Sequence, residues 1–467
     1  MSRLRLLPLL IAAVLAAPVA HAEIKLVAVG GLSGHDRDLS SETSAPLENG
    51  QPGNLLGGLG SGLAYAGGNN FLALPDRGPN ATPYNSGVSN TASYINRFQS
   101  LSMDLQPSAP GSLLPFDLVP SLQRTTLLHA AQPLVYGSGV DFGLGDGAPA
   151  LNAINRTRYL TGRSDNFDGF RPSTDARNGR LDPEGIRLSN DGSNVYITDE
   201  YGPYVYRFNR KTGLRTAVYT LPSYFAATFL SANGDVEIAT NTQGRVANKG
   251  MEGLAISPDG SALYGIMQSP LAQDGGTSAP YTRIVRIDLV TGATREYAYA
   301  LSNIGTVAKP KYPTVSEIVA INDHEFLVDE RDGKGLGDNS NAAFKKLYRI
   351  DLAGANDVSG ITGAAGLAPH AVAKTLFLDL VSALGAKGFT PANVPAKIEG
   401  ISFGPDIVVD GVSKHTLWIA NDNDFLGTVT DALHPAGIEN PNLFFVFTVD
   451  RADLPAFEAQ RFAKKFD

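Results

Sequence analysis

Four glutamates recur at the start of similar short segments, and their type and spacing suggest chemistry more directly than any other residues of this chain. They are Glu184, Glu252, Glu317 and Glu399. If each one opens the innermost strand of a repeated unit, all four gather at one mouth of a central channel. Like charges held so close together favour a bound cation or a raised pKa. We therefore predict that they are catalytic; the alternative is that each accepts backbone hydrogen bonds or pairs with an arginine as a structural pin.

A second set of acidic and amide residues follows the next short apolar segment of each repeat. Its members are Asp76, Asp199, Glu200, Glu330, Asn421 and Asp422. Strand pairing brings this set to the same mouth as the four glutamates. Oxygen ligands in a flexible ring suit Ca²⁺ better than a transition metal. We predict that these residues hold calcium, with solvated turn-capping residues as the alternative.

Three cationic residues stand beside these acidic positions in the sequence. They are Arg77, Lys249 and Arg331. An arginine fork matches the oxygens of a phosphate group, so all three are predicted to bind an anionic substrate. An ion pair with the neighbouring carboxylates is the alternative for each.

Composition excludes several other classes of function. The 467 residues carry a formal net charge of −8, which disfavours nucleic acid and anionic membrane surfaces as partners. The chain has no cysteine, so it has neither a disulfide nor a thiol nucleophile. The motifs G-x-S-x-G, HExxH and Arg-His-Gly are also missing from the sequence.

The elements that must position these residues form a repeat of four strands. A segment such as Glu252-Gly253-Leu254-Ala255-Ile256 is followed by a Gly-containing turn and a second strand, and then by two more strands. Repeats of this kind are typical of a β-propeller. We predict an all-β propeller of six blades, starting near residues 59, 183, 250, 315 and 397, with the sixth between 103 and 161. An irregular insertion is expected at about 137–180, and residues 24–29 should pair with 444–449 to close the ring.

The N-terminus has the pattern of a secretory signal. A basic start precedes the apolar run from Leu6 to Val19, and Ala20-His21-Ala22 fits the small-x-small cleavage rule. We predict that residues 1–22 are removed and that 23–467 form a single domain with no membrane anchor. The protein is then periplasmic or secreted, and a closed propeller is expected to be a monomer.

The sequence resembles the phytase-like family, also called "esterase-like activity of phytase" proteins. The resemblance rests on Asp76-Arg77-Gly78-Pro79, Asp182-Pro183-Glu184-Gly185 with Asp199-Glu200-Tyr201-Gly202-Pro203, Asn248-Lys249-Gly250-Met251-Glu252-Gly253, and Glu399-Gly400 with Asn421-Asp422-Asn423. It runs from about residue 30 to the C-terminus. It implies an exported propeller that hydrolyses phosphate esters with the help of calcium.

The leading hypothesis is a calcium-dependent phosphoric ester hydrolase that acts on a small anionic ester at the acidic mouth of the channel. One alternative is another propeller ester hydrolase or lactonase that uses a single calcium ion. The other alternative is a non-catalytic binding platform that calcium stabilises, because a propeller fold alone never proves catalysis.

Overall fold

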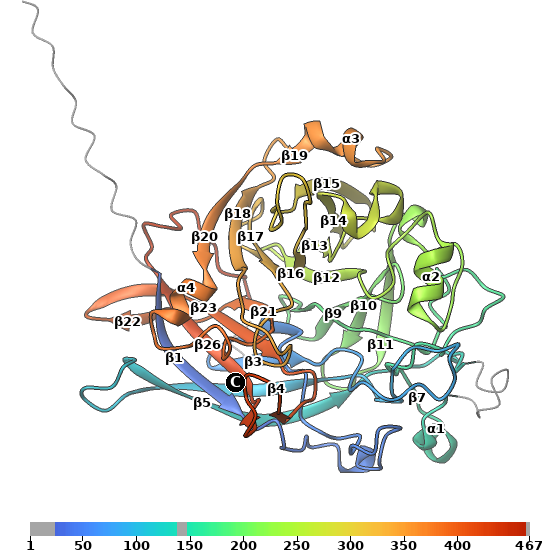
Figure 1. The fold of residues 1–467 in the computed structure, drawn as a ribbon, viewed down its shortest axis with the longest axis horizontal. Helices are drawn as coiled ribbons and strands as arrows, with labels where there is room; N and C mark the ends of the chain where they lie inside the picture. The colour runs from blue at the N-terminus through green and yellow to red at the C-terminus, as the bar shows by residue number, and fades with distance from the viewer. Residues whose placement is uncertain (1–23, 138–146, 464–467) are drawn as a thin grey trace, which may run out of the picture.

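The computed structural model describes residues 24–137 and 147–463, and these form five antiparallel sheets around a central axis (Figure 1). Each sheet is one blade, in which strands follow one another from the axis outward. From inside to outside, blade one contains β2 (Gly62–Tyr65), β3 (Asn70–Leu74), β4 (Arg97–Pro107) and β5 (Phe116–Leu127). Blade two contains β8 (Ile186–Leu188), β9 (Asn194–Asp199), β10 (Tyr204–Asn209) and β11 (Arg215–Thr220).

The last three blades follow the same order, and blades three and five each have one additional short strand. Blade three contains β12 (Met251–Ile256), β13 (Ala262–Met267), β14 (Tyr281–Asp288), β15 (Thr294–Ala300) and the short β19 (Ala371–Val372). Blade four contains β16 (Thr314–Ala320), β17 (Glu325–Arg331), β18 (Lys345–Asp351) and β20 (Lys374–Asp379). Blade five contains β21 (Lys397–Phe403), β23 (Val412–Asp422), β26 (Asn442–Val449) and β1 (Lys25–Leu32), with β22 (Ile407–Val409) paired to β23.

The burial of each strand follows its distance from the axis. All residues of β12, β13 and β17 are buried, because a neighbouring blade covers each of their faces. The outermost strand β11 alternates between half-buried and exposed residues, as expected where one face meets water. The turns between the first two strands of blades two and three contain Gly192 and Gly260, whose φ angles of 70° and 74° suit glycine.

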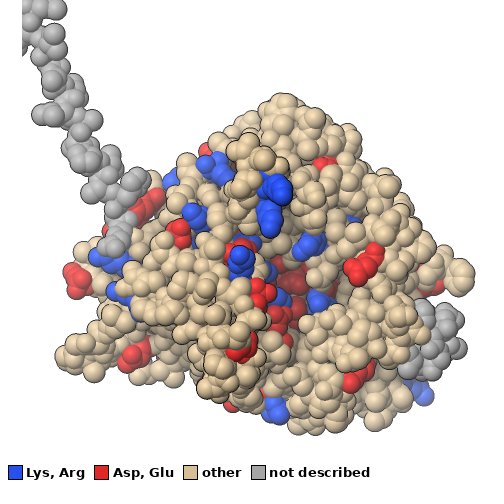
Figure 2. Space-filling model, in the orientation of Figure 1, with Lys and Arg blue, Asp and Glu red and all other residues tan. Residues whose placement is uncertain are grey.

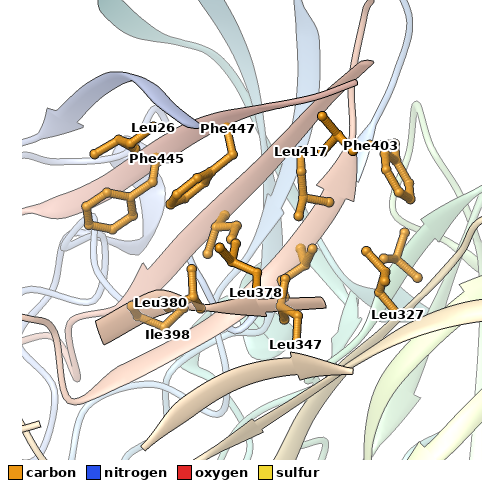
Figure 3. Packing of buried hydrophobic residues seen from close by; sticks show 14 of the residues in the cluster. Leu26, Leu327, Leu347, Leu378, Leu380, Ile398, Phe403, Leu417, Phe445 and Phe447 are labelled. Carbon is orange, nitrogen blue, oxygen red and sulfur yellow. The ribbon is translucent and has the colours of Figure 1, made fainter. Parts of the chain in front are cut away.

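The five largest clusters of buried hydrophobic residues lie one at each contact between neighbouring blades. Figure 3 shows the cluster between blades four and five, where Leu327 and Leu347 of blade four face Leu417 and Phe447 of blade five. The only tryptophan of the chain, Trp418, lies between blades five and one, with its ring 4.6 Å from that of Phe71. Stability is therefore distributed around the ring rather than concentrated in one centre.

The two ends of the described chain hold the ring together. Strand β1 pairs with β26 and completes blade five, as predicted from the sequence. The C-terminal segment then runs across the mouth of the channel that lies opposite the predicted acidic site. Its backbone amides of Glu458, Arg461 and Ala463 donate hydrogen bonds to blades four, three and two, at 2.8, 2.9 and 2.7 Å.

The remaining elements are short and lie outside the blades. They are α1 (Ala150–Asn155), α2 (Gly234–Thr240), α3 (Ala364–Leu367), α4 (Leu380–Gly385), and the strand pairs β6 (His129–Ala130) with β7 (Arg158–Tyr159) and β24 (Thr428–Val429) with β25 (Ile438–Glu439). No helix among the described residues is long and apolar enough to cross a bilayer.

The prediction of an all-β propeller is confirmed, but the blade count is wrong. The segment assigned to a sixth blade supplies β4 and β5, which pair with each other over 11 residue pairs and are the outer strands of blade one. The predicted signal segment, residues 1–22, lies outside the described residues, as do residues 138–146 of the predicted insertion.

Candidate functional site

The innermost segment of each blade presents one side chain at the mouth of the channel, and in β12, β16 and β21 this residue lies at a β-bulge. In β12 the pairing of Met251 with Met267 is followed by that of Gly253 with Ile266, which leaves Glu252 as the extra residue. Strand β21 is irregular in the same way at Glu399. A bulge turns a side chain out of the regular alternation. The equivalent positions of the five blades, in order, are Ser61, Glu184, Glu252, Ser316 and Glu399.

Glu317 does not belong to this ring, contrary to the sequence prediction. In β16 the bulge falls on Ser316, and Glu317 pairs with Asp329 as Gly253 pairs with Ile266. A shift of one residue moves a strand side chain to the other face, so Glu317 points into the channel. Its Oε1 accepts backbone bonds from Leu254 and Ile318, both at 2.9 Å. Of the alternatives for this residue, the structural pin fits its position.

Arg187 closes the channel below the ring and is the partner of Glu317. One terminal nitrogen donates to the carbonyls of Leu63 and Ile186 at 2.7 Å, and the other donates to Ile318 at 2.9 Å and Ile401 at 3.2 Å. The distance from the guanidinium to Glu317 Oε2 is 3.1 Å. One buried side chain therefore joins four of the five blades and separates the two mouths.

A second ring lies where the second strands end. Gln268 stands two residues after Ile266, the partner of Gly253, and Arg331 stands two residues after Asp329, the partner of Glu317. The backbone amides of Gln268 and Glu200 donate equivalent hydrogen bonds to the preceding inner segments, at 2.8 and 2.9 Å. The ring, in order of blades, is Asp76, Glu200, Gln268, Arg331 and Asp422.

Three residues that the sequence assigns to calcium each stand one position before a residue of the second ring. These three residues face away from the mouth. Asp199 accepts hydrogen bonds from the backbone amides of Asp182 and Tyr201, at 3.2 and 2.9 Å. Asn421 accepts one from the amide of Leu443, at 2.5 Å. In each case the neighbouring residue of the strand takes the position at the mouth.

Glu330 is the third of these residues, and it is held inside blade four. Tyr299 donates its hydroxyl to Oε1 at 2.6 Å, the amide of Ser302 donates to Oε2 at 3.0 Å, and Lys374 forms an ion pair with the carboxylate. The structure therefore does not bring Glu330 to the predicted calcium site.

Six carboxylates at the mouth converge in two groups. The ligand atoms in each group lie within 4.8 Å of one another; the first contains Asp76, Asp422 and Asp424, and the second contains Asp182, Glu184 and Glu200. Burial raises the pKa of Asp76, and the charge of Asp422 raises it further. Burial likewise raises the pKa of Glu184, with an added effect from Glu252. Both groups consist of oxygen donors only, which suits a hard cation such as Ca²⁺.

Glu252 lies at the centre of a chain of hydrogen bonds. Its Oε2 accepts from the Gln268 amide at 2.7 Å, and the amide oxygen of Gln268 accepts from Lys249 at 2.7 Å. A further hydrogen bond joins the carboxyl groups of Glu252 and Glu200. Burial, followed by the charge of Glu200, raises the pKa of Glu252. The two carboxyl groups are therefore arranged to share a proton.

The cationic residues are interleaved with these acids. Arg331 donates from Nε to Ser316 at 2.8 Å and forms an ion pair with Glu399. Arg77 donates to Asn248 at 2.8 Å and lies 3.4 Å from Asp182. Each thus combines the two predicted alternatives, since it has a carboxylate partner and also lines the mouth cavity.

The rings enclose an open cavity of about 450 Å³, which we call the mouth cavity. Figure 2 shows red acidic atoms inside a hollow near the middle of this face, with blue basic atoms around them. Among the described residues, seven acidic and five basic side chains line it. The lining is therefore net negative, and an anionic substrate would need a cation there to reverse the local charge.

Three site residues were missed in the sequence, although a period of two points to each. Asp182 stands two residues before Glu184, and Lys397 stands two residues before Glu399. Asp424 stands two residues after Asp422, and Lys397 bonds both of these aspartates, Asp422 at 2.8 Å. Only Lys397 of the three lies within a strand, so regular strand alternation does not account for the spacing.

A family model described as "Phytase-like: Esterase-like activity of phytase" matches residues 54–425. A protein of Arthroderma benhamiae described as an "Uncharacterized secreted protein" is 30% identical over 333 residues. The match covers 63% of this chain and 62% of the length of that relative.

Two solved structures that are similar to this chain share little of its sequence. The periplasmic gluconolactonase of Pseudomonas aeruginosa is 12% identical, with a TM-score of 0.32 over 91% of this chain and 99% of that one. The PQQ-bound aldose sugar dehydrogenase of Streptomyces coelicolor is 13% identical, with a TM-score of 0.30 over 84% of this chain and 95% of that one.

Proposed function

Because the chain belongs to the phytase-like family, we propose that it is an exported, calcium-dependent hydrolase of small phosphoric esters that acts in the mouth cavity. The observation that carries this proposal is that both carboxylate groups contribute residues, Asp76 from one and Glu184 and Glu200 from the other, to the cavity that the three cationic side chains also line. The relative described as secreted supports export. A monomer is proposed because the ring of blades is already closed.

The residues fit calcium on the chemistry of their donors. Asp76, Asp422 and Asp424 would hold one ion, and Asp182, Glu184 and Glu200 would hold another. Carboxylate oxygens in an irregular, partly open arrangement are suited to the variable coordination of this ion. Bound calcium would neutralise the carboxylates and polarise a phosphoryl oxygen.

The mouth is divided into two halves of different chemistry. In the second ring, blades one, two and five supply Asp76, Glu200 and Asp422, whereas blades three and four supply Gln268 and Arg331. The acidic half would hold calcium, and the other half would bind phosphate oxygens. Arg331 is positioned for this by Ser316 and Glu399, so we assign Glu399 a positioning role. Lys249, held by Gln268, would supply a second positive charge.

Glu252 is the residue that we assign to proton transfer. Burial and the charge of Glu200 raise the pKa of Glu252, so this carboxyl group is suited to carry a proton. During hydrolysis a water oxygen forms a bond to phosphorus and the phosphorus–oxygen bond to the alcohol breaks. Glu252 would give its proton to the departing alcohol and recover one from the attacking water.

The test is phosphate release from phytate and from p-nitrophenyl phosphate by the mature protein, with calcium and with excess chelator. Calcium-dependent release should fall at least about 100-fold in Glu252→Gln, the usual effect of losing an acid–base group. Glu458→Gln, at the exposed opposite mouth, is the matched control and should retain full activity. Folded protein that releases no phosphate but opens a lactone would transfer the proposal to lactone hydrolysis. Inactive protein that calcium still stabilises would point to a binding platform.

A further inference from the structure

The ammonium group of Lys397 bonds two of the three carboxylates of the first carboxylate group. Lys397 begins β21 and pairs in register with Asp422, the last residue of β23. Its Nζ donates to Asp422 Oδ2 at 2.8 Å and forms an ion pair with Asp424. The ligand atoms of Asp76, Asp422 and Asp424 lie within 4.8 Å of one another. A positive charge of the protein itself therefore stands at the group that would hold a calcium ion.

Lys397 also separates this group from the mouth cavity. Among the described residues, Lys397 and Asp76 line the cavity, whereas Asp422 and Asp424 do not. The Lys397 side chain is 29% exposed, and that of Asp422 is 1% exposed. The lysine therefore stands between Asp422 and the space through which an ion or a substrate would arrive.

The carboxylates are held in place by the backbone rather than by Lys397. Asp422 Oδ1 accepts a hydrogen bond from the amide of Asp424 at 2.7 Å. Asp424 and Phe425 both have left-handed φ angles, 51° and 55°, which are uncommon for residues other than glycine. The ring of Phe425 is buried and lies 5.1 Å from that of Tyr94, which fixes this turn. The group should therefore keep its shape when the lysine side chain moves.

Asp76 shows that Lys397 satisfies the group only in part. This residue is 5% exposed, and its Oδ1 accepts from the amide of Gly78 at 2.9 Å. Its Oδ2 has no hydrogen-bond donor among the described residues. An ammonium carries one charge and three donors, whereas Ca²⁺ carries two charges and takes about six to eight oxygen ligands. Calcium therefore matches three carboxylates better than Lys397 does.

The second carboxylate group differs, because no described lysine forms an ion pair with it. Its ion-pair partner among the described residues is Arg77, which lies 3.4 Å from Asp182. Glu184 is 7% exposed, and no described residue donates a hydrogen bond to its carboxylate. A cation would therefore enter this group without displacing a lysine.

We propose that Lys397 and calcium are alternative occupants of the first carboxylate group, and that the ammonium of Lys397 moves into the mouth cavity when calcium takes its place. Both cannot stay, because positive charges about 4 Å apart repel each other. The flexible four-carbon stem of lysine lets the ammonium move while β21 stays fixed.

This inference rests on the calcium dependence in the proposed function and adds a regulation to it. The second group fills at a lower calcium concentration than the first, because only the first requires a displacement. Filling of the first group then adds the charge of Lys397 to the cavity in which the anionic ester binds. Binding of the ester should therefore respond to calcium in two steps.

The direct test is acetylation of the mature protein, followed for each lysine by mass spectrometry. Without calcium, the two aspartates should protect Lys397, and saturating calcium should raise its acetylation rate several-fold. Lys334 is the internal control, because it is exposed, lines the same cavity and has no carboxylate partner among the described residues. An unchanged or lower rate at Lys397, in protein that calorimetry shows to bind calcium, would overturn the exchange and leave the calcium dependence of the hydrolase standing.

Lys397→Met removes the competing ammonium. In calorimetric titrations with calcium, the weaker of two binding events should tighten about tenfold, as expected for the loss of a charged hydrogen bond, and the tighter event should change less than about twofold. Lys334→Met is the matched variant and should change neither event by more than about twofold. A weaker event that is lost or unchanged in Lys397→Met would overturn the proposal. If Lys397 is exposed by calcium but no ester is cleaved, the exchange stands and the proposed hydrolysis fails.

Discussion

Replacing Arg187 with methionine should destabilise the whole ring, although this residue lies in no predicted site. The guanidinium donates to four carbonyls at 2.7–3.2 Å and pairs with Glu317 at 3.1 Å. Methionine has a similar reach but no donor. Leaving Glu317 buried without its partner costs about 3–5 kcal/mol, and carbonyls that no water reaches add about 1 kcal/mol each.

The contribution of the ion pair can be separated by a double-mutant cycle. Glu317→Gln should cost less than Arg187→Met, because Gln still accepts the two backbone hydrogen bonds and leaves no buried negative charge. In the double variant the loss from Arg187→Met should shrink by about 2–3 kcal/mol, since no charge is stranded. The free energy of unfolding is measured in urea through the fluorescence of Trp418, the single tryptophan, which is 1% exposed.

The pH dependence of the stability loss in Arg187→Met provides the decisive test. Burial raises the pKa of Glu317 to about 7, although Arg187 lowers it in part. A carboxyl whose folded pKa is raised stabilises the fold below its unfolded pKa, and that contribution is lost as the pH rises through about 7. Without Arg187 the folded pKa rises further, so the loss in Arg187→Met should be larger at pH 8 than at pH 5. A loss below about 1 kcal/mol, additive variants or a loss independent of pH would refute this account.

Three further predictions concern the residues at the mouth and those just beside it. Glu330→Ala should cost about 2–4 kcal/mol in urea unfolding, because it strands Lys374, while calcium affinity measured by calorimetry stays within twofold; a large loss of affinity would return Glu330 to the metal site. Burial raises the pKa of Asp199 to about 7, so the native protein should lose stability as the pH rises from 4 to 7. Across that range the free energy of unfolding of Asp199→Asn should rise by about 2–4 kcal/mol relative to that of the parent. A difference between the two proteins that does not change with pH would contradict this. Calcium at 100 times its Kd should raise the free energy of unfolding by about 2.7 kcal/mol for each occupied site. Glu200→Gln should reduce that gain, whereas Asp199→Asn should not. Equal gains in both variants would count against the second carboxylate group as a calcium site.

The fold could be predicted from the sequence because the inner strands repeat. The Glu-Gly pair before the apolar segment in three blades, and its degenerate forms Ser61-Gly62 and Glu317-Ile318 in the other two, located the starts of all five near residues 59, 183, 250, 315 and 397. The count failed because β4 and β5 are long, at 11 and 12 residues, and because residues 128–185 then separate blade one from blade two, while their described part adds no sheet to the ring. Strand β5 also packs against β1 of blade five, a contact between distant segments that the sequence does not reveal.

The predicted residues that do not face the mouth each stand one position from a residue that does, and that single position decides the side on which a side chain lies. Where two polar residues are adjacent, as in Asp199-Glu200 or Asn421-Asp422, composition does not show which one faces the mouth. The strand registers show which residue faces the mouth, because side chains alternate between the two faces along a strand. The same ambiguity placed Glu317 in the ring that Ser316 occupies, since a bulge cannot be located from an apolar pattern alone.

The closure of blade five by β1 makes the first described strand dependent on the last. The hydroxyl of Thr448 bonds the carbonyl of Lys25, and these two residues are 423 positions apart. During synthesis β1 emerges first, yet its partner β26 is made after all the other blades, so the edge of β1 stays unpaired for most of that time. Bringing such distant ends together carries one of the largest chain-entropy costs in the molecule. The ring is therefore expected to fold late and as a whole. A chain that ended before β26 would expose the unpaired, aggregation-prone edge of β1.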